Sequence, residues 1–515
     1  MRGNNRMERK INTIILCAIS NPWLETLEIL RDNLGINPVY YIGWRKDLTK
    51  KRLNEHFPDC YYQTIQDAWK GIGFPENNYC KIDEEILNSV AKEEIIFLKM
   101  LDRLDVDRYS FNLTYRSYFF HDLLSTWLNI IDEKKIELII SPSVPHRGFD
   151  YALYVASKIR KIEFIMFQMT PFNDSSFILD NVTQTPDYIK RNILKRDNNT
   201  VLCKDIEEKI ENIMQSYNKA IPDYMVNQKN KSEQYNFYFD LLKTAAYLLY
   251  NGPKILEKSF SYHVQKNKMP SKSKITVYQN AINVIKGRKY KINLENFYLS
   301  LCDDTIPERY VLVALHYQPE ETSCPTGGRY ADQTLIVRLL HNFLKDDIDI
   351  VIKEHKTQFF PFGEGEVGRD KYFYERLRSI SPRVKFVSFD ENPFNLIDGA
   401  LATVTISGTI GWESVIRGTP AIIFGRAWYE DMPGVFKIKT YEELVRAWPK
   451  IVNCKNKMNH DLILNYHKIL QGYFINALHY KSYISRSNRT FNESSDNLYL
   501  GIRNHLVQKG WVFDD

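Results

Sequence analysis

Residues 401–429, LATVTISGTIGWESVIRGTPAIIFGRAWY, constrain the fold of this chain more than any other stretch of its sequence. The run from Ala402 to Ile406 is apolar and rich in β-branched residues, as expected of a strand that is buried on both faces. Ser407-Gly408-Thr409 follows at a point where a helix can begin. Arg417-Gly418 then ends that helix, and a second strand starts at Ala421. The order strand, turn, helix, strand predicts half of a nucleotide-binding α/β fold.

The turn at the start of this helix is a candidate phosphate site. Backbone N–H groups in the first turn of a helix have no intrahelical acceptor, and the helix dipole adds partial positive charge there. Ser407, Gly408 and Thr409 would hold a phosphate, and Glu413, one turn later, would accept hydrogen bonds from ribose hydroxyls. The alternative is an ordinary βαβ unit in which the serine and threonine only cap the helix.

A second cluster of polar residues follows the strand predicted at 349–352, which ends in Lys353-Glu354-His355. Another strand is predicted at 383–388. Ligands of open α/β sheets bind beyond the carboxyl ends of the strands, so we expect His355 and the turn 407–409 to face one crevice. Lys353 and His355 are two residues apart and would share a side if the strand continues, which suits a phosphate. A histidine that is simply a satisfied polar group is the alternative.

A third predicted strand, 310–315, runs into the loop HYQPEETSCPTGG at 316–328. Catalytic groups of such folds commonly lie in loops that directly follow strands. The candidates here are His316, Gln318 and the adjacent carboxylates Glu320 and Glu321. A solvated acidic turn with glycines at positive φ is the alternative.

The N-terminal part of the chain predicts a second βαβ arrangement, with strands at 13–19 and 38–43 around a helix at 22–34. A further strand at 137–140 leads into the loop SPSVPHRGFD, in which His146, Arg147 and Asp150 lie close together before a helix. The planar fork of Arg147 suits a sugar carboxylate. Asp150 is equally consistent with a helix N-cap.

HYQPE, the following Gly-Gly pair, IKEH and TISGTIGWESVIRGTPAIIFGRAWY together resemble the capsule or surface polysaccharide biosynthesis protein family, with good coverage from about Tyr310 to Phe436. The resemblance implies the α/β GT-B fold, two facing Rossmann-like domains, here with a helical insertion. It also implies similarity to retaining transferases of 3-deoxy-ulosonic acids such as Kdo, which use CMP-activated donors. One departure is His355-Lys356, where the family usually has His-Pro.

The resemblance assigns roles and regions to this chain. His316, Gln318, Lys353, His355, Ser407, Gly408, Thr409, Glu413 and Arg147 would bind the donor. Glu320, with Glu321 in reserve, would attack or shield the anomeric carbon, although related transferases use an aspartate there. Asp150 or His146 would serve the acceptor hydroxyl as general acid or base. The expected regions are an acceptor domain at 1–180, a helical, basic insertion at 181–300, a nucleotide-sugar domain at 301–460, and C-terminal helices at 461–515 that cross back to the first domain.

The amino-acid composition limits the kinds of partner that this protein can bind. The net charge of +6, from 69 basic and 63 acidic residues, is too mild for nucleic acid as the main partner. Seven scattered cysteines without a CxxC pair fit a reducing cytoplasm. No run approaches the roughly twenty apolar residues of a membrane span, so we expect any contact with the inner membrane to be peripheral. No DxD-like motif stands out, so we expect neither a metal nor another cofactor, only the nucleotide sugar and a glycan or lipid-linked glycan acceptor.

The insertion combines an aromatic, leucine-rich stretch at 235–250 with a basic stretch from Lys254 to Lys291. Such a pairing can dock on anionic lipid or a charged glycan; a solvated helical face over a private core is the alternative.

Three other functions remain open on the sequence alone. A sugar-nucleotide epimerase would share the paired halves, a non-catalytic glycan-assembly protein would keep only the fold, and a glycerol-phosphate or ribitol-phosphate transferase would also be GT-B-like.

Overall fold

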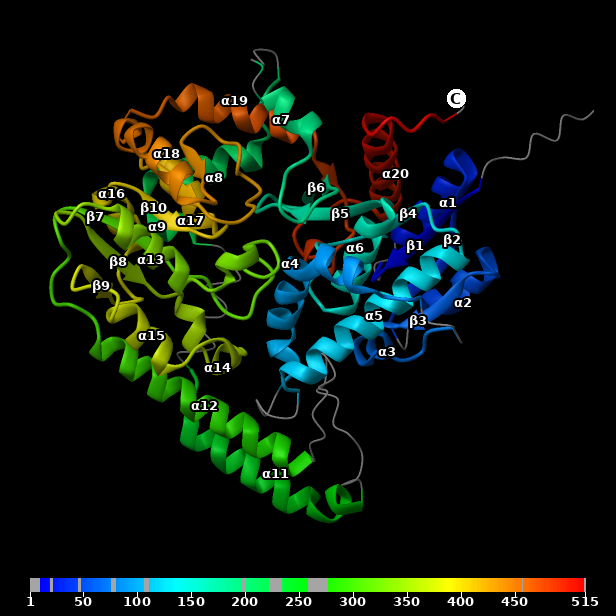
Figure 1. The fold of residues 1–515 in the computed structure, drawn as a ribbon, viewed down its shortest axis with the longest axis horizontal. Coiled ribbons are helices and arrows are strands. Elements are labelled where there is room, and N and C mark those ends of the chain that lie inside the picture. The colour runs from blue at the N-terminus through cyan, green and yellow to red at the C-terminus, as the bar shows by residue number, and fades with distance from the viewer. Residues whose placement is uncertain are drawn as a thin grey trace, which may run out of the picture. The chain divides into compact units, whose positions relative to one another are not determined.

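The computed structural model describes residues 10–18, 22–44, 48–75, 80–105, 111–193, 195, 200–221, 234–257, 277–455 and 457–513. Ile19, the end of the first predicted strand, and 258–276 of the predicted basic stretch lie outside the described residues. The chain divides into two compact units, each of which contains one sheet (Figure 1). Unit 1 comprises 1–98, 113–200 and 468–515, and unit 2 comprises 99–112 and 201–467.

Unit 1 is built on a seven-stranded sheet of order β13-β6-β5-β4-β1-β2-β3. The strands from β3 to β5 in this order are parallel, whereas β6 pairs antiparallel with both β5 and β13. The strands are β1 (Ile11–Leu16), β2 (Ile36–Gly43), β3 (Tyr61–Thr64), β4 (Leu138–Ser141), β5 (Glu163–Met169), β6 (Ser175–Leu179) and β13 (Ile475–Asn476).

The helices of unit 1 cover this sheet, and α20, at the end of the chain, packs against α1 near its start. The N-cap Thr490 and Glu493 of α20 form a reciprocal capping box, which satisfies two N–H groups at the helix start. The helices are α1 (Pro22–Leu34), α2 (Leu48–His56), α3 (Ile65–Lys70), α4 (Glu84–Met100), α5 (Leu113–Glu133), α6 (Phe149–Arg160), α7 (Asp187–Ile193) and α20 (Phe491–Gln508).

Unit 2 is built on a six-stranded, fully parallel sheet of order β12-β11-β10-β7-β8-β9. Val311 and Val313 of β7, Ile350 and Ile352 of β8 and Val404 of β10 all belong to one buried core. The strands are β7 (Tyr310–Ala314), β8 (Asp349–Lys353), β9 (Val384–Val387), β10 (Thr403–Thr405), β11 (Ala421–Ile423) and β12 (Val435–Lys437).

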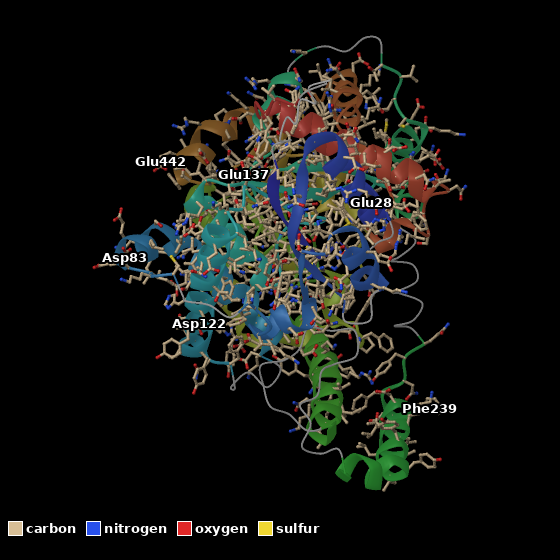
Figure 2. The ribbon with its side chains drawn as sticks, turned by 90° about the vertical axis from the view of Figure 1, so that its right-hand side faces the viewer. Glu28, Asp83, Asp122, Glu137, Phe239 and Glu442 are labelled. Carbon is tan, nitrogen blue, oxygen red and sulfur yellow. The ribbon has the colours of Figure 1, made fainter. Side chains whose placement is uncertain are left out.

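The long helix α12 of unit 2 contacts α14 and α15 beside this sheet, and α11 packs along α12 (Figure 1). Figure 2 labels Phe239 on the side of α11 that is turned away from α12. The helices are α8 (Lys204–Gln215), α9 (Tyr217–Ala220), α11 (Phe237–Glu257), α12 (Val277–Ser300), α13 (Thr334–Phe343), α14 (Gly365–Gly368), α15 (Lys371–Arg378), α16 (Pro393–Gly399), α17 (Thr409–Ile416), α18 (Tyr441–Cys454) and α19 (His460–Gln471).

The prediction of an α/β fold with two Rossmann-like halves is confirmed, but several short strands were not predicted. β3, β6, β12 and β13 were missed, and β13 interrupts a C-terminal segment that was expected to be helical. β6 and β13 form a short antiparallel edge. Strands of two to five residues give too little periodicity to be recognised without their partners.

No helix within the described ranges is both long enough and apolar enough to cross a membrane.

Candidate functional site

His316 joins the carboxyl ends of β7 and β10. Its Nε2 lies 2.9 Å from Thr405 Oγ1 and accepts a hydrogen bond of 3.1 Å from the Ser407 N–H. Because a backbone N–H can only donate, Nε2 must be unprotonated, and Nδ1 carries the proton of a neutral ring. Burial lowers the pKa of His316 to about 3, with smaller contributions from His355 and Arg369. His316 therefore links the loop after β7 to the turn after β10.

Two backbone N–H groups of the turn before α17 already have hydrogen-bond acceptors. The Ser407 N–H is bound to His316, and the Gly408 N–H donates to Thr405 Oγ1 at 3.3 Å. The amides that remain for an anion are those of Thr409 and Ile410, which begin the helix and have no intrahelical acceptor. A Cβ at Gly408 would lie 3.0 Å from Thr405 Oγ1 and 3.4 Å from His316 Nε2, so glycine permits this close approach. The turn stays a predicted phosphate site, but the N–H groups that remain for a phosphate are those of Thr409 and Ile410 and not those of Ser407 and Gly408.

Glu413 lies one turn into α17 and is half-buried. Burial raises the pKa of its carboxyl to about 7. A carboxyl in this state changes charge near neutral pH, which is common at functional sites. The contact of Glu413 with a ribose stays a prediction.

The end of β8 brings Lys353 and His355 to the same region. The Lys353 ammonium donates to the carbonyl of Phe389, at the end of β9, and burial lowers the pKa of Lys353 to about 8. His355 Nδ1 lies 2.6 Å from Thr357 Oγ1, and burial, with Lys353 and Arg369, lowers the pKa of His355 to about 4. His355 also lowers the pKa of His316, so the two rings are near neighbours. Neither contact assigns a phosphate role.

A buried ion pair behind these loops was missed by the sequence analysis. Arg369 Nε donates to Glu354 Oε2 at 2.9 Å, and both side chains are almost fully buried. Arg369 Nη2 also donates to the His316 carbonyl at 2.9 Å, and Glu354 Oε1 accepts the His355 N–H at 2.7 Å. The pair thus ties the loop after β7 to the loop after β8. A carboxylate directly after an apolar strand signalled Glu354, whereas Arg369 has no local signal.

The HYQPE loop contains a buried side-chain NH₂ group that has no hydrogen-bond partner among the described residues. The Gln318 N–H donates to Gln358 Oε1 at 2.9 Å, and the Gln318 carbonyl accepts a hydrogen bond from Gln358 Nε2 at 3.1 Å. The side-chain Nε2 of Gln318 is buried and has no hydrogen-bond partner in the described part of the chain. Buried unsatisfied donors are rare and call for a ligand or another explanation. Gln318 is therefore the donor-binding candidate that the structure supports most directly.

The two acidic candidates of the loop differ in their surroundings. Glu320 is exposed at the surface of the loop, and its Oε2 accepts a hydrogen bond of 2.7 Å from Thr322 Oγ1. Desolvation by the surrounding protein raises the pKa of Glu320, while Thr322 and Arg103 oppose the rise. Glu321 is half-buried, and its carbonyl accepts a hydrogen bond from Thr326 Oγ1.

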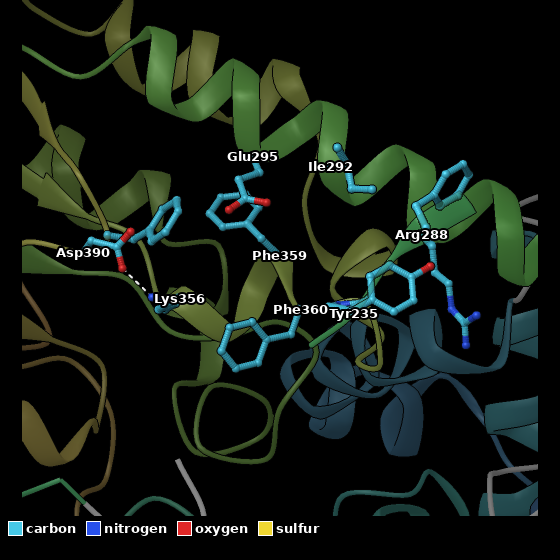
Figure 3. A pocket seen from close by; sticks show the side chains of 11 residues that line it. Tyr235, Arg288, Ile292, Glu295, Lys356, Phe359, Phe360 and Asp390 are labelled. Carbon is cyan, nitrogen blue, oxygen red and sulfur yellow. Dashed lines mark hydrogen bonds and ion pairs between the residues drawn. The ribbon is translucent and has the colours of Figure 1, made fainter. Parts of the chain in front are cut away.

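A pocket of about 330 Å³ opens beside the ends of β8 and β9 (Figure 3). Arg288, Ile292 and Glu295 of α12 form one wall, opposite the Lys356–Asp390 ion pair. Burial raises the pKa of Glu295, Asp390 raises it further, and Lys356 opposes the rise. Aromatic faces combined with charged groups are typical of pockets that hold a sugar ring or another polar ring. The remaining lining residues are Tyr235, Phe237, Phe359, Phe360, Pro361 and Phe389.

The N-terminal candidates lie in unit 1: His146 and Arg147 lie between β4 and α6, and Asp150 lies in the first turn of α6. Both carboxylate oxygens of Asp150 accept backbone N–H groups, from His146 at 3.1 Å, Arg147 at 2.7 Å and Tyr151 at 2.8 Å. The N-cap of α6 is Gly148, and Asp150 lies in the first turn of the helix, so the N-cap alternative is wrong. The Asp150 carboxylate instead organises the loop before the helix. His146 Nδ1 lies 2.7 Å from the Val144 carbonyl, so Nδ1 carries the proton and Nε2 is the basic nitrogen. Arg147 lies near Asp150 and near Cys17, whose pKa burial raises to about 11.

Among the described residues, Glu163, Asp180 and His505 of unit 1 form one group with metal-binding geometry, their ligand atoms lying within 4.8 Å of one another. The Lys509 ammonium already lies 2.7 Å from Asp180 and 3.8 Å from Glu163, which neutralises the carboxylates. None of these residues belongs to the candidate site.

Residues 300–467 match the family model described as capsule polysaccharide biosynthesis protein. This segment holds every unit 2 candidate from His316 to Glu413 and ends where unit 2 ends. The segment 300–467 is therefore similar to the capsule polysaccharide biosynthesis proteins. The resemblance inferred from the sequence is thereby confirmed. The comparison with curated proteins finds no match.

Solved structures were also compared with this chain. The UDP-GlcNAc 2-epimerase from Methanocaldococcus jannaschii is 12% identical, with a TM-score of 0.25, and the match covers 90% of this chain and 99% of that one. The beta Kdo 2,7 transferase KpsC from Thermosulfurimonas dismutans is 10% identical, with a TM-score of 0.26 and coverage of 73% and 88%. The trehalose 6-phosphate synthase from Burkholderia multivorans is 10% identical, with a TM-score of 0.25 and coverage of 98% and 100%.

Proposed function

We propose that this chain is a cytoplasmic GT-B glycosyltransferase of capsule polysaccharide synthesis. The proposed donor is a CMP-activated 3-deoxy-ulosonic acid, either Kdo or a nonulosonic acid, and the proposed acceptor is a glycan or lipid-linked glycan. Support comes from the family match of residues 300–467 and from the hydrogen bonds that join the ends of β7 and β10 at His316.

The donor phosphate would lie at the start of α17. The amides of Thr409 and Ile410 and the dipole of the helix would stabilise the negative charge that develops on the leaving phosphate. Gln318, whose Nε2 has no partner among the described residues, would donate a hydrogen bond to the nucleotide sugar. Lys353 and His355 would complete the site from β8, Ser407 and Gly408 would shape it from the end of β10, and Glu413 would accept the ribose hydroxyls.

The proposed route to retention is two successive displacements at the anomeric carbon. In the proposed first step, a carboxylate oxygen of Glu320 bonds to that carbon while the bond to the phosphate oxygen breaks, and CMP leaves with the electron pair. In the second step, the acceptor hydroxyl displaces Glu320 and loses its proton. Glu321 is the alternative nucleophile.

His146 and Asp150 of unit 1 are the proposed general acid–base candidates for the acceptor hydroxyl. His146 is the better base of the two candidates there, because its Nε2 is the basic nitrogen, whereas both oxygens of Asp150 are engaged by backbone amides. Arg147 would pair with the carboxylate of an acidic sugar. No step of this scheme uses a metal ion.

The observation that carries the proposal is the junction at His316, which holds the turn before α17 beside the HYQPE loop. A thermal-shift screen with CMP, CDP, UDP and GDP tests the donor class, because a ligand that binds the folded state raises the melting temperature. We expect CMP to give the largest shift. A preference for UDP would contradict the proposed donor.

Activity is then tested with CMP-activated Kdo and a capsule glycan acceptor. We expect Glu320→Gln to lower turnover by about 10³-fold or more while the CMP-induced shift stays unchanged. Glu321→Gln is the matched control, with a smaller loss. Epimerisation of a nucleotide sugar in the absence of any acceptor would overturn the transferase assignment.

A further inference from the structure

The helix α11 exposes an apolar face that its packing does not use. Tyr238, Phe239, Leu242, Leu249 and Tyr250 are 76%, 58%, 67%, 82% and 83% exposed. Isolated apolar residues are normal on protein surfaces, but a contiguous set on one helix marks a site of interaction.

Helical geometry separates this face from the packed one. At about 100° per residue, Tyr238, Leu242 and Leu249 fall within about 40° of one another. The half-buried residues of the same helix lie on the opposite side and face α12: they are Phe237, Asp240, Thr244 and Leu248. Asp240 anchors that side through an ion pair with Arg288 of α12. Since α11 already packs through one stripe, its second apolar face is not needed to hold the α11–α12 hairpin together.

The charge of the hairpin indicates what covers this face. In the sequence, residues 237–300, of which 258–276 lie outside the described residues, contain eleven Lys and Arg and three Asp and Glu, a formal charge of +8, whereas the whole chain carries +6. The remainder of the chain therefore has a formal charge of −2, and the positive charge is concentrated in residues 237–300. Lys243, Lys286 and Lys289 are exposed on the hairpin, and none of its carboxylates with described side chains is exposed.

We propose that the exposed face of α11 docks on an anionic phospholipid surface. Tyrosine, phenylalanine and leucine enter the boundary between headgroups and acyl chains, and lysines beside them pair with the phosphates of anionic lipids. Lys243 stacks over the ring of Phe239 at 4.5 Å, which places an ammonium group directly beside an inserting side chain. The binding is peripheral, and it is a property of the hairpin that does not depend on the transferase activity.

Vesicle flotation with the full chain tests this proposal. Vesicles of phosphatidylglycerol and phosphatidylcholine are compared with vesicles of phosphatidylcholine alone, without nucleotide, at about 0.1 M salt. We expect the wild-type protein to float with the anionic vesicles and to lose at least fivefold in partition coefficient on the neutral ones. Raising the salt should also release it, because exposed charges are screened.

Variants locate the surface. Leu242→Glu with Leu249→Glu should reduce partitioning at least tenfold, whereas Leu500→Glu, on α20 and 48% exposed, should change it less than twofold. If the double variant does not fold, Lys286→Ser with Lys289→Ser replaces it, with an expected loss of at least threefold on anionic vesicles. Equal flotation of wild type and hairpin variants overturns the proposal. A wild-type dimer that these variants convert to a monomer also overturns it, because a second copy would then cover the face. A protein that floats but transfers no sugar would contradict only the proposed function.

Discussion

At the scale of single residues, Glu413 combines a half-buried position with a carboxyl that titrates near neutrality. The pKa is raised from 4.5 to about 7 because burial penalises the charged form. A carboxyl with a raised folded pKa favours the fold below its unfolded pKa, and this contribution is lost as pH rises through about 7. At pH 8 the ionised group therefore destabilises unit 2, a cost that a site tolerates when the charge binds a ligand.

We expect Glu413→Gln to raise the free energy of unfolding at pH 8 by about 2–4 kcal/mol, since one pKa unit corresponds to about 1.4 kcal/mol. The gain should largely vanish at pH 5, and nucleotide affinity should fall at both pH values. Urea unfolding at the two pH values and titration with CMP measure these effects. Glu375→Gln, an exposed carboxyl on α15, is the control and should change stability by less than about 0.5 kcal/mol. A destabilised Glu413→Gln at pH 8 would contradict the expected burial cost.

At the scale of elements, the candidate site is assembled from loops that follow separate strands. Glu354 after β8 and Arg369 after α14 hold the loop that begins with His316, through bonds to the His355 amide and the His316 carbonyl. Tyr374 of α15 also donates to Glu354 Oε2 at 2.8 Å. The position of the HYQPE loop thus depends on elements up to 58 residues further along the chain, as the Tyr374 contact shows.

We expect Glu354→Gln to lower the free energy of unfolding by about 3–5 kcal/mol, because it leaves the Arg369 guanidinium buried without its counter-charge. The double variant Glu354→Gln with Arg369→Met should be less destabilised than the sum of the single variants. Urea denaturation of the four proteins measures the coupling. Arg376→Gln, which removes an exposed pair with Asp332 at 3.8 Å, should cost less than about 1 kcal/mol. Costs of equal size for Glu354→Gln and Arg376→Gln would show that the buried pair does not organise the loops.

At the scale of the whole molecule, buried neutral histidines occur in both units. Burial lowers the pKa of His316 to about 3 and those of His355, His467 and His479 to about 4. Three of these residues belong to unit 2 and His479 belongs to unit 1. A histidine with a lowered folded pKa stabilises the fold fully above about 6.5, and this contribution is lost as pH falls toward 4, because the unfolded chain takes up the proton first. Acid sensitivity is therefore expected throughout the molecule.

His467 gives the cleanest test of this expectation. Its Nε2 accepts the Trp412 indole N–H at 2.9 Å, and its Nδ1 lies 2.7 Å from the Ile463 carbonyl. His467→Gln keeps an acceptor for Trp412 but cannot titrate. Between about pH 6 and pH 4.5, we expect the wild-type protein to lose about 1.4 kcal/mol per pH unit more than the variant. If the free energies of unfolding of the two proteins fell equally over this pH range, His467 would not be buried in its neutral form.

The sequence by itself determined the α/β class, the two Rossmann-like halves and the turns at which candidate residues follow strands. These features are encoded locally, since a buried parallel strand reads as an apolar run and a helix start reads as a glycine-containing turn. Only the tertiary structure decided which groups meet: the His316–Ser407 bond, the Glu354–Arg369 pair and the Gln318–Gln358 bonds join residues that are up to 91 positions apart. The short edge strands β6 and β13 depend on pairing across about 300 residues. Such contacts are selected by the packing of the whole core, and no local pattern specifies them.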